Sequence, residues 1–277
     1  MSKMKPLFLA VPAVLALCSG ACMPGCVLTS PANYKRTVTA QNAQASPAPV
    51  KVRTGNGYIR VSRSASGGVE VSADAALQTP ERRDAFAVRS ELVGDTWVIE
   101  PLWPDGKALS NERCAFTIAL PDAPALDLET SNGEIEFGGF SGPAHAKTSN
   151  GAIHASGHNG PVDAHTSNGA IELRAVASPV KASTSNGHIT IVLADPASGP
   201  VDAHTSNGAI DLTVPAGFKG RLAARTSNGG VSANLAAGAK ADLKKSSGTV
   251  TFAEGSEPQS TLETSNGGIH ITQTAAK

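Results

Sequence analysis

A short motif recurs through the second half of this 277-residue chain: Thr-Ser-Asn-Gly, followed two positions later by Ile or Val. Between Thr130 and the last copy, the steps are 18, 18, 18, 21, 21, 19 and 19 residues. Self-similarity at a nearly fixed period is typical of repeat architectures, so this motif constrains the fold more than any other feature. Close copies start at Thr130, Thr148, Thr166, Thr184, Thr205, Thr226 and Thr264; a decayed copy starts at Lys245 and an outlier at Thr54.

Apolar and polar residues alternate on both sides of each Asn-Gly. In the copy that starts at Thr166, Val162 and Ala164 precede the corner, and Ile171 and Leu173 follow it. This period-two pattern predicts two half-buried strands per repeat. Asn and Gly tolerate the left-handed backbone that a tight corner needs. A second corner is marked by a proline five residues before the Thr in four copies: Pro143, Pro161, Pro179 and Pro200.

Two architectures fit this pattern. Each Asn-Gly could close an antiparallel hairpin in a meander, or each repeat could be one rung of a β-solenoid in which like positions stack at about 4.8 Å. Eight repeats of two strands make sixteen strands, more than the roughly ten that an open sheet usually carries. The favoured fold class is therefore all-β, a single-chain β-solenoid of about eight Thr-Ser-Asn-Gly rungs with an N-terminal β cap region.

A solenoid would stack the corner asparagines into a ladder in which each side-chain amide donates to the next. Ser247 takes the asparagine position in the decayed copy, so the rung near 245–252 is predicted to be the weakest. The expected ladder consists of Asn132, Asn150, Asn168, Asn186, Asn207, Asn228 and Asn266.

The amino terminus has the features of an export signal. Lys3 and Lys5 precede an apolar run of about 11 residues, which is shorter than the roughly 20 that a membrane-spanning helix needs. Cys22 follows small residues and is the expected lipidation site; the alternative is ordinary signal cleavage and a free periplasmic protein. Cys26 and Cys114 could form a disulfide in an oxidising compartment, or Cys114 could be a small buried apolar residue.

Four segments follow from these patterns. Residues 1–21 form the signal peptide, 22–48 a flexible tether rich in small and polar residues, 49–125 an irregular β region, and 126–274 the repeats. Strands are expected at Val69, Trp97 and Phe116, and a helical turn or loop at Pro80. We expect the aromatic residues of 49–125 to close one end of the stack.

Charge excludes one class of partner. The chain has 23 basic and 23 acidic residues, and without residues 1–21, which hold two lysines and no acid, the net charge is −2. There is no basic field to neutralise phosphates, so nucleic acid is not an expected partner. No metal or cofactor is expected either, because His165 and His204 would lie two rungs, about 9.6 Å, apart.

An exported, lipid-anchored β chain with repeated Ser-Asn-Gly-x-Ile corners resembles the bacterial "putative adhesin" or toast-rack family of envelope proteins of unknown function. The resemblance covers about residues 50–274. It implies a β-helical body outside the cytoplasm and a label of adhesion, and it carries no catalytic residues to transfer.

The expected function is a non-catalytic scaffold or binding module in the cell envelope, in the periplasm or at the outer membrane. It would attach to the membrane through Cys22 and present polar columns, with His165, His204 and Arg225 in one of them, to a glycan or a protein. The alternative is a polysaccharide lyase or hydrolase on a β-helix, for which Asp163 and Asp202 are candidate carboxylates. Short, uniform connections leave little wall for the groove that such an enzyme needs.

Overall fold

The computed structural model describes residues 34–42, 48–64, 68–177, 179–197, 199–252 and 259–275. Almost all ordered elements among them are strands, which confirms the all-β expectation. The helical elements of these residues are α1 (Pro80–Ala85), where a helical turn was one of the two expectations, and the short 3-10 turn η1 (Pro104–Gly106). Thr79 caps α1 by accepting a hydrogen bond from the amide of Arg82.

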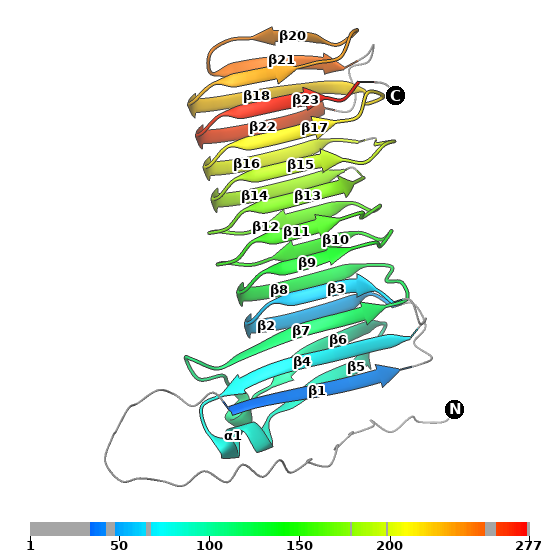
Figure 1. Cartoon of the computed structure of the whole chain (residues 1–277), viewed down its shortest axis with the longest axis vertical. Helices are drawn as coiled ribbons and strands as arrows, with labels where there is room; N and C mark the ends of the chain where they lie inside the picture. The colour runs from blue at the N-terminus through cyan, green and yellow to red at the C-terminus, as the bar shows by residue number, and fades with distance from the viewer. Residues whose placement is uncertain are drawn as a thin grey trace. The chain divides into compact units, whose positions relative to one another are not determined.

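The described strands form two sheets (Figure 1). The eleven-stranded sheet contains, in spatial order, β1 (Tyr34–Asn42), β4 (Val69–Leu77), β7 (Arg113–Leu120), β3 (Ile59–Arg63), β9 (Ile135–Gly138), β11 (Ile153–Ser156), β13 (Ile171–Val176), β15 (Ile189–Leu193), β17 (Ile210–Val214), β23 (Ile269–Gln273) and β19 (Val231–Asn234). The twelve-stranded sheet contains β20 (Lys240–Leu243), β21 (Ser247–Phe252), β18 (Gly220–Asn228), β22 (Gln259–Asn266), β16 (Val201–Asn207), β14 (Val180–Asn186), β12 (Val162–His165), β10 (Ala144–Lys147), β8 (Leu126–Asn132), β2 (Val50–Asn56), β6 (Thr96–Leu102) and β5 (Ala87–Val93).

Each Asn-Gly corner joins a strand of the twelve-stranded sheet to a strand of the other sheet, and neighbouring repeats pair in parallel and in register. The hairpin alternative is therefore wrong for these corners. The copy at Thr54, which the sequence places as an outlier, is a full member: Thr54 pairs with Thr130 and Asn56 pairs with Asn132.

The decayed copy at Lys245 is not a rung, which corrects the expectation from its spacing. β20 and β21 form an antiparallel hairpin whose turn holds residues 244–246, and β21 pairs antiparallel with β18. Leu243, at a position that is apolar and inward in the true repeats, is 38% exposed. Without an asparagine at the corner, the segment lacks the side chain that would tie it to the ladder.

The order of the repeats in space differs from their order in the chain. β22 lies between β16 and β18, and β23 lies between β17 and β19. Figure 1 shows these red C-terminal strands between the yellow strands that precede them in sequence. Asn266 therefore follows Asn207 in the ladder, and Asn228 comes after it.

The core is a thin layer between the two sheets, filled from the predicted inward positions. Val162, Ala164, Ile171 and Leu173 are all buried, as expected from the alternation. The threonine of each corner is buried as well. In seven of the eight corners its hydroxyl donates to a glycine carbonyl of the preceding rung at 2.9–3.1 Å, as Thr166 does to Gly151, and Thr54 donates to the Cys114 carbonyl at 2.8 Å. A buried hydroxyl needs such a partner.

The asparagine ladder is present, and it is longer than predicted. Each amide donates to the side-chain oxygen of the asparagine one rung before it, over 2.7–2.9 Å. The ladder begins at Asn56, whose own amide donates to the Glu112 carbonyl at 3.1 Å. The eight members in spatial order are Asn56, Asn132, Asn150, Asn168, Asn186, Asn207, Asn266 and Asn228.

Antiparallel strands end both sheets at the N-terminal side. β1 pairs with β4, and β5 pairs with β6. β1 lies inside the segment predicted as a flexible tether; it is ordered because Val38 and Ala40 pack against the core. The predicted aromatic closure is also found here, since Phe86 and Phe116 are buried and Trp103 packs edge-on against Phe86.

A buried ion pair fixes this cap. Glu112 is fully buried and accepts two hydrogen bonds from Arg82, at 2.7 and 2.8 Å. The Arg82 bonds and the amides of Leu109 and Gln78 lower the pKa of Glu112. Cys114 is buried with a free thiol, which fits the simpler of the two expectations for it. Cys22 and Cys26 lie outside the described residues.

Candidate functional site

Outward-facing residues form columns, because equivalent positions of successive repeats pair in register. On the twelve-stranded sheet the predicted column runs through Lys147, His165, Ser183, His204, Glu263 and Arg225 in that spatial order. His165 and His204 are two strands apart, as predicted. Arg225 does not neighbour His204, because the C-terminal repeat places Glu263 between them.

This reordering creates a polar depression around Glu263, with a volume of about 410 Å³. His204 Nδ1 lies 4.0 Å from the Glu263 carboxylate, and Arg225 is the in-register neighbour on the other side. Arg225 supplies donors, Glu263 supplies acceptors, and the hydroxyls supply both. The lining residues are His204, Arg225, Thr226, Ser227, Ser246, Ser247, Glu263, Thr264 and Ser265.

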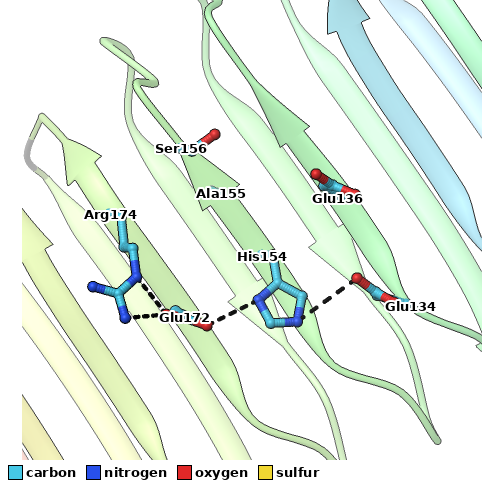
Figure 2. A pocket seen from close by; sticks show the side chains of 7 residues that line it. All are labelled: Glu134, Glu136, His154, Ala155, Ser156, Glu172 and Arg174. Carbon is cyan, nitrogen blue, oxygen red and sulfur yellow. Dashed lines mark hydrogen bonds and ion pairs between the residues drawn. The ribbon is translucent and has the colours of Figure 1, made fainter.

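A second depression, of about 260 Å³, lies on the eleven-stranded sheet and is lined mainly by charged residues of β9, β11 and β13 and by Glu134 just before β9 (Figure 2). His154 sits at its centre, with Nδ1 3.2 Å from Glu172 and Nε2 3.7 Å from Glu134. Arg174 also bonds Glu172, and this bond is the largest cause of the lowered pKa of that carboxyl. His154 and Glu172 hold equivalent positions of successive repeats and pair in register, whereas Glu134 and Arg174 reach them from other positions.

The remaining charged columns contain exposed or half-exposed pairs. His145 lies 3.4 Å from Asp163, and Lys181 pairs in register with both Asp163 and Asp202. His188 lies 2.8 Å from Asp211 on the other sheet. Such solvated pairs contribute at most about 1 kcal/mol each. The candidate carboxylates Asp163 and Asp202 line neither of the two depressions described above.

One histidine is internal, and the sequence analysis did not single it out. The His158 ring is buried, packs edge-on against Phe137 at 5.4 Å between ring centroids, and contacts the Gly142 carbonyl through Nε2 at 2.9 Å. Its Nδ1 is buried without a hydrogen-bond partner. Burial lowers the pKa of His158, so the ring is neutral at pH 7.

Neither metal chemistry nor a helical membrane span is indicated within the described ranges. No group of three or more His, Cys, Asp or Glu side chains there is arranged to hold a metal ion. No helix of these ranges has both the length and the apolar character needed to cross a bilayer.

Among known proteins, this chain is similar to several solved structures. No family model matches the chain, and no curated protein matches it. A "putative adhesin" from Bacteroides fragilis aligns over 86% of this chain and 97% of its own, at 14% identity and a TM-score of 0.45. Another "putative adhesin", from Parabacteroides distasonis, covers 86% and 97% at 9% identity and a TM-score of 0.43.

A third similar structure is a "putative cell adhesion protein" from Clostridium sporogenes. It aligns over 87% of this chain and all of its own, at 13% identity and a TM-score of 0.37. The names of these neighbours agree with the family resemblance stated from the sequence. Likeness at this level assigns no ligand and no activity to the chain.

Proposed function

We propose that this chain is a non-catalytic β-solenoid of the bacterial cell envelope that acts as an adhesin-like scaffold or binding module. The observation that carries the proposal is the parallel, in-register stacking of eight Thr/Asn/Gly corners, which sets polar side chains in regular columns on two sheet faces. Repeats of this kind build extended binding surfaces, whereas enzymes need convergent groups in a groove.

The binding surface of this proposal is the depression around Glu263. Arg225, Glu263 and the serine hydroxyls offer the mixed donors and acceptors that a glycan or a polar protein surface requires. In the twelve-stranded sheet these groups come from three adjacent strands, β18, β22 and β16, together with the β20–β21 turn. A rigid sheet holds them at fixed spacing, which limits the entropy lost on binding.

The test is binding of the purified protein to peptidoglycan, outer-membrane vesicles and capsular polysaccharide. Arg225→Ala and Glu263→Gln should each weaken binding about tenfold or more, because a hydrogen bond to a charged group contributes roughly 1.5–3 kcal/mol. Lys181→Ala is the matched control, since it removes an exposed charge from another column of the same sheet. If the wild-type protein binds none of these materials, the binding proposal fails and a structural or sensory accessory role is left.

Export and lipid attachment at Cys22 belong to the same proposal. The supporting observations are the basic and apolar residues at the start of the chain and the small residues before Cys22. In the native host, the wild-type protein should fractionate with membranes and label with a fatty-acid analogue. Cys22→Ser should abolish both. Labelling that survives this substitution would contradict lipidation at Cys22.

The alternative function, a polysaccharide lyase or hydrolase, draws on the carboxylates in Figure 2. Glu134, Glu136 and Glu172 lie beside His154 and Arg174, which are the residue types that such chemistry uses. Incubation with a polysaccharide panel, followed by measurement of reducing ends and of absorbance from unsaturated products, separates the two functions. Turnover that is lost in Glu172→Gln would support the enzyme and overturn the scaffold.

A further inference from the structure

The C-terminal repeat occupies a slot that the rest of the chain leaves open. β16 and β18 do not pair with each other, and neither do β17 and β19. Instead β22 pairs in parallel with both β16 and β18, and β23 pairs with both β17 and β19. The chain therefore skips one rung after β17, builds the next rung, and fills the gap with its last strands.

Specific hydrogen bonds and one close backbone contact hold the C-terminal repeat in the slot. Asn266 donates to Asn207 at 2.8 Å and accepts from Asn228 at 2.9 Å. Thr264 donates its hydroxyl hydrogen bond to the Gly208 carbonyl at 2.9 Å. At Gly267 a Cβ atom would come within 2.0 Å of that same carbonyl oxygen, so only glycine fits there.

Apolar contacts complete the recognition. Leu262, Ile269 and Ile271 of the inserted repeat are buried between the two sheets. The Ser260 hydroxyl, also buried, accepts from the amide of Val201, the first residue of β16. A segment that fills the slot must therefore carry an apolar residue, then Thr-Ser-Asn-Gly, then two alternating aliphatic residues. This is the repeat motif of this chain.

This repeat also differs from the other seven in its connectivity. Each of the others is continued by the chain at both ends, so it cannot leave the stack unless its neighbours unwind. Among the described residues no strand follows Gln273, so residues 259–273 are joined to another rung only through their N-terminal end. They can leave and enter the slot without threading a loop.

From this topology we infer that the slot is a strand-acceptor site for a second copy of this chain, and that residues 259–273 of one copy occupy the slot of the other. The contacts in the exchanged state are the same as those within one chain, which is the condition under which exchange of an identical element costs little. The product is a dimer in which each inserted segment makes four parallel strand pairings, β22 with β16 and β18 and β23 with β17 and β19.

Paired single-cysteine variants test this directly. His204→Cys is prepared in one sample and Glu263→Cys in another; these positions are in-register neighbours on β16 and β22, and their side chains face outward. The two proteins are unfolded and refolded together, or incubated together while folded, and are then oxidised. Adjacent positions in paired strands lie within the Cα range of a disulfide. All samples carry serine at the three leader cysteines, Cys18, Cys22 and Cys26.

Exchange should give a disulfide-linked dimer on a non-reducing gel, several-fold more abundant than in a control mixture. The control is Ser183→Cys mixed with His204→Cys, which are in-register neighbours on strands that the chain continues at both ends. Arg225→Cys mixed with Glu263→Cys reports the other side of the slot. Circular dichroism verifies that each variant is folded, and the double variant His204→Cys/Glu263→Cys verifies that the disulfide forms within one chain.

The result that overturns the inference is a dimer yield no higher than the control for both reporter pairs, after co-refolding as well as after co-incubation. A high yield for both pairs, together with a wild-type dimer on size exclusion after refolding at high concentration, supports it.

Discussion

Replacing Gly169 by alanine should destabilise the protein sharply, because there is no room for one methyl group between adjacent corners. A Cβ atom at Gly169 would lie 1.9 Å from the carbonyl oxygen of Gly151 and 2.5 Å from its carbon. Both atoms are backbone, so no flexible side chain can move aside. The two rungs would have to separate locally by about 1 Å or more to restore ordinary van der Waals distances.

Three hydrogen bonds depend on that approach. Thr166 donates to the same Gly151 carbonyl at 3.0 Å, and Asn168 donates its side-chain amide to Asn150 at 2.9 Å and its backbone amide to the Ser149 carbonyl at 2.8 Å. At about 1 kcal/mol for each net hydrogen bond, their loss amounts to roughly 3 kcal/mol. This is a large part of the 5–15 kcal/mol by which domains are typically stable.

Urea unfolding followed by far-UV circular dichroism measures the effect. Gly55→Ala is the control: Gly55 holds the serine position of the Thr54 corner, and a Cβ atom there would meet no atom within 4 Å. The control should change the free energy of unfolding by less than about 0.5 kcal/mol. If Gly169→Ala were as stable as this control, close backbone contact between corners could not be what requires glycine.

Three further predictions concern other parts of the fold. Burial raises the pKa of the Cys114 thiol to about 12, so peptide mapping after iodoacetamide treatment at pH 8 should find it unmodified in the native protein and modified in denaturant. The pKa of His158 is lowered in the folded state, so the unfolded state binds the proton first as the pH falls. The contribution of His158 to the free energy of unfolding should therefore be fully present above pH 6.5 and be lost as the pH drops below it. His158→Gln should reduce this loss, and the exposed control His165→Gln should not. Amides of residues 240–252 should exchange hydrogen faster than those of 180–186, because β20 is an exposed edge strand; equal protection would contradict this.

Much of the fold can be predicted from the sequence because the alternation of apolar and polar residues identifies the buried and exposed positions of each repeat. The alternation around Thr166 identifies both strands and the buried positions, and the Asn-Gly corner identifies the ladder. The strands expected at Val69, Trp97 and Phe116 are β4, β6 and β7. These features are local, and local patterns are what a sequence displays most directly.

The order of the rungs could not be predicted, for a physical reason. A Thr-Ser-Asn-Gly corner offers the same hydrogen bonds and the same apolar residues to any other corner, so the pattern at Thr264 fits beside Thr205 as well as beside Thr226. For this reason chain order does not give the neighbours in the surface column: the repeat of Arg225 follows that of His204 in the sequence, but Glu263 lies between them in space. The candidate site around Glu263 depends on that order.

The ends of the stack explain why copies of this chain would join through the slot rather than end to end. A further rung could add only where threonine, asparagine and glycine present the repeat pattern at an open edge. At one end the Asn56 amide is satisfied by the Glu112 carbonyl, β6 pairs in parallel with β2, and β5 ends the sheet antiparallel to β6. At the other end β21 pairs antiparallel with β18 and is followed by β20, whose Lys240 and Asp242 are exposed. β19 is the edge strand of the eleven-stranded sheet there, but a further rung needs an edge in both sheets, and β21 occupies the edge of β18. Antiparallel and charged edges discourage further pairing. Within the described chain, the slot filled by residues 259–273 is therefore where the repeat pattern meets two matching edges at once.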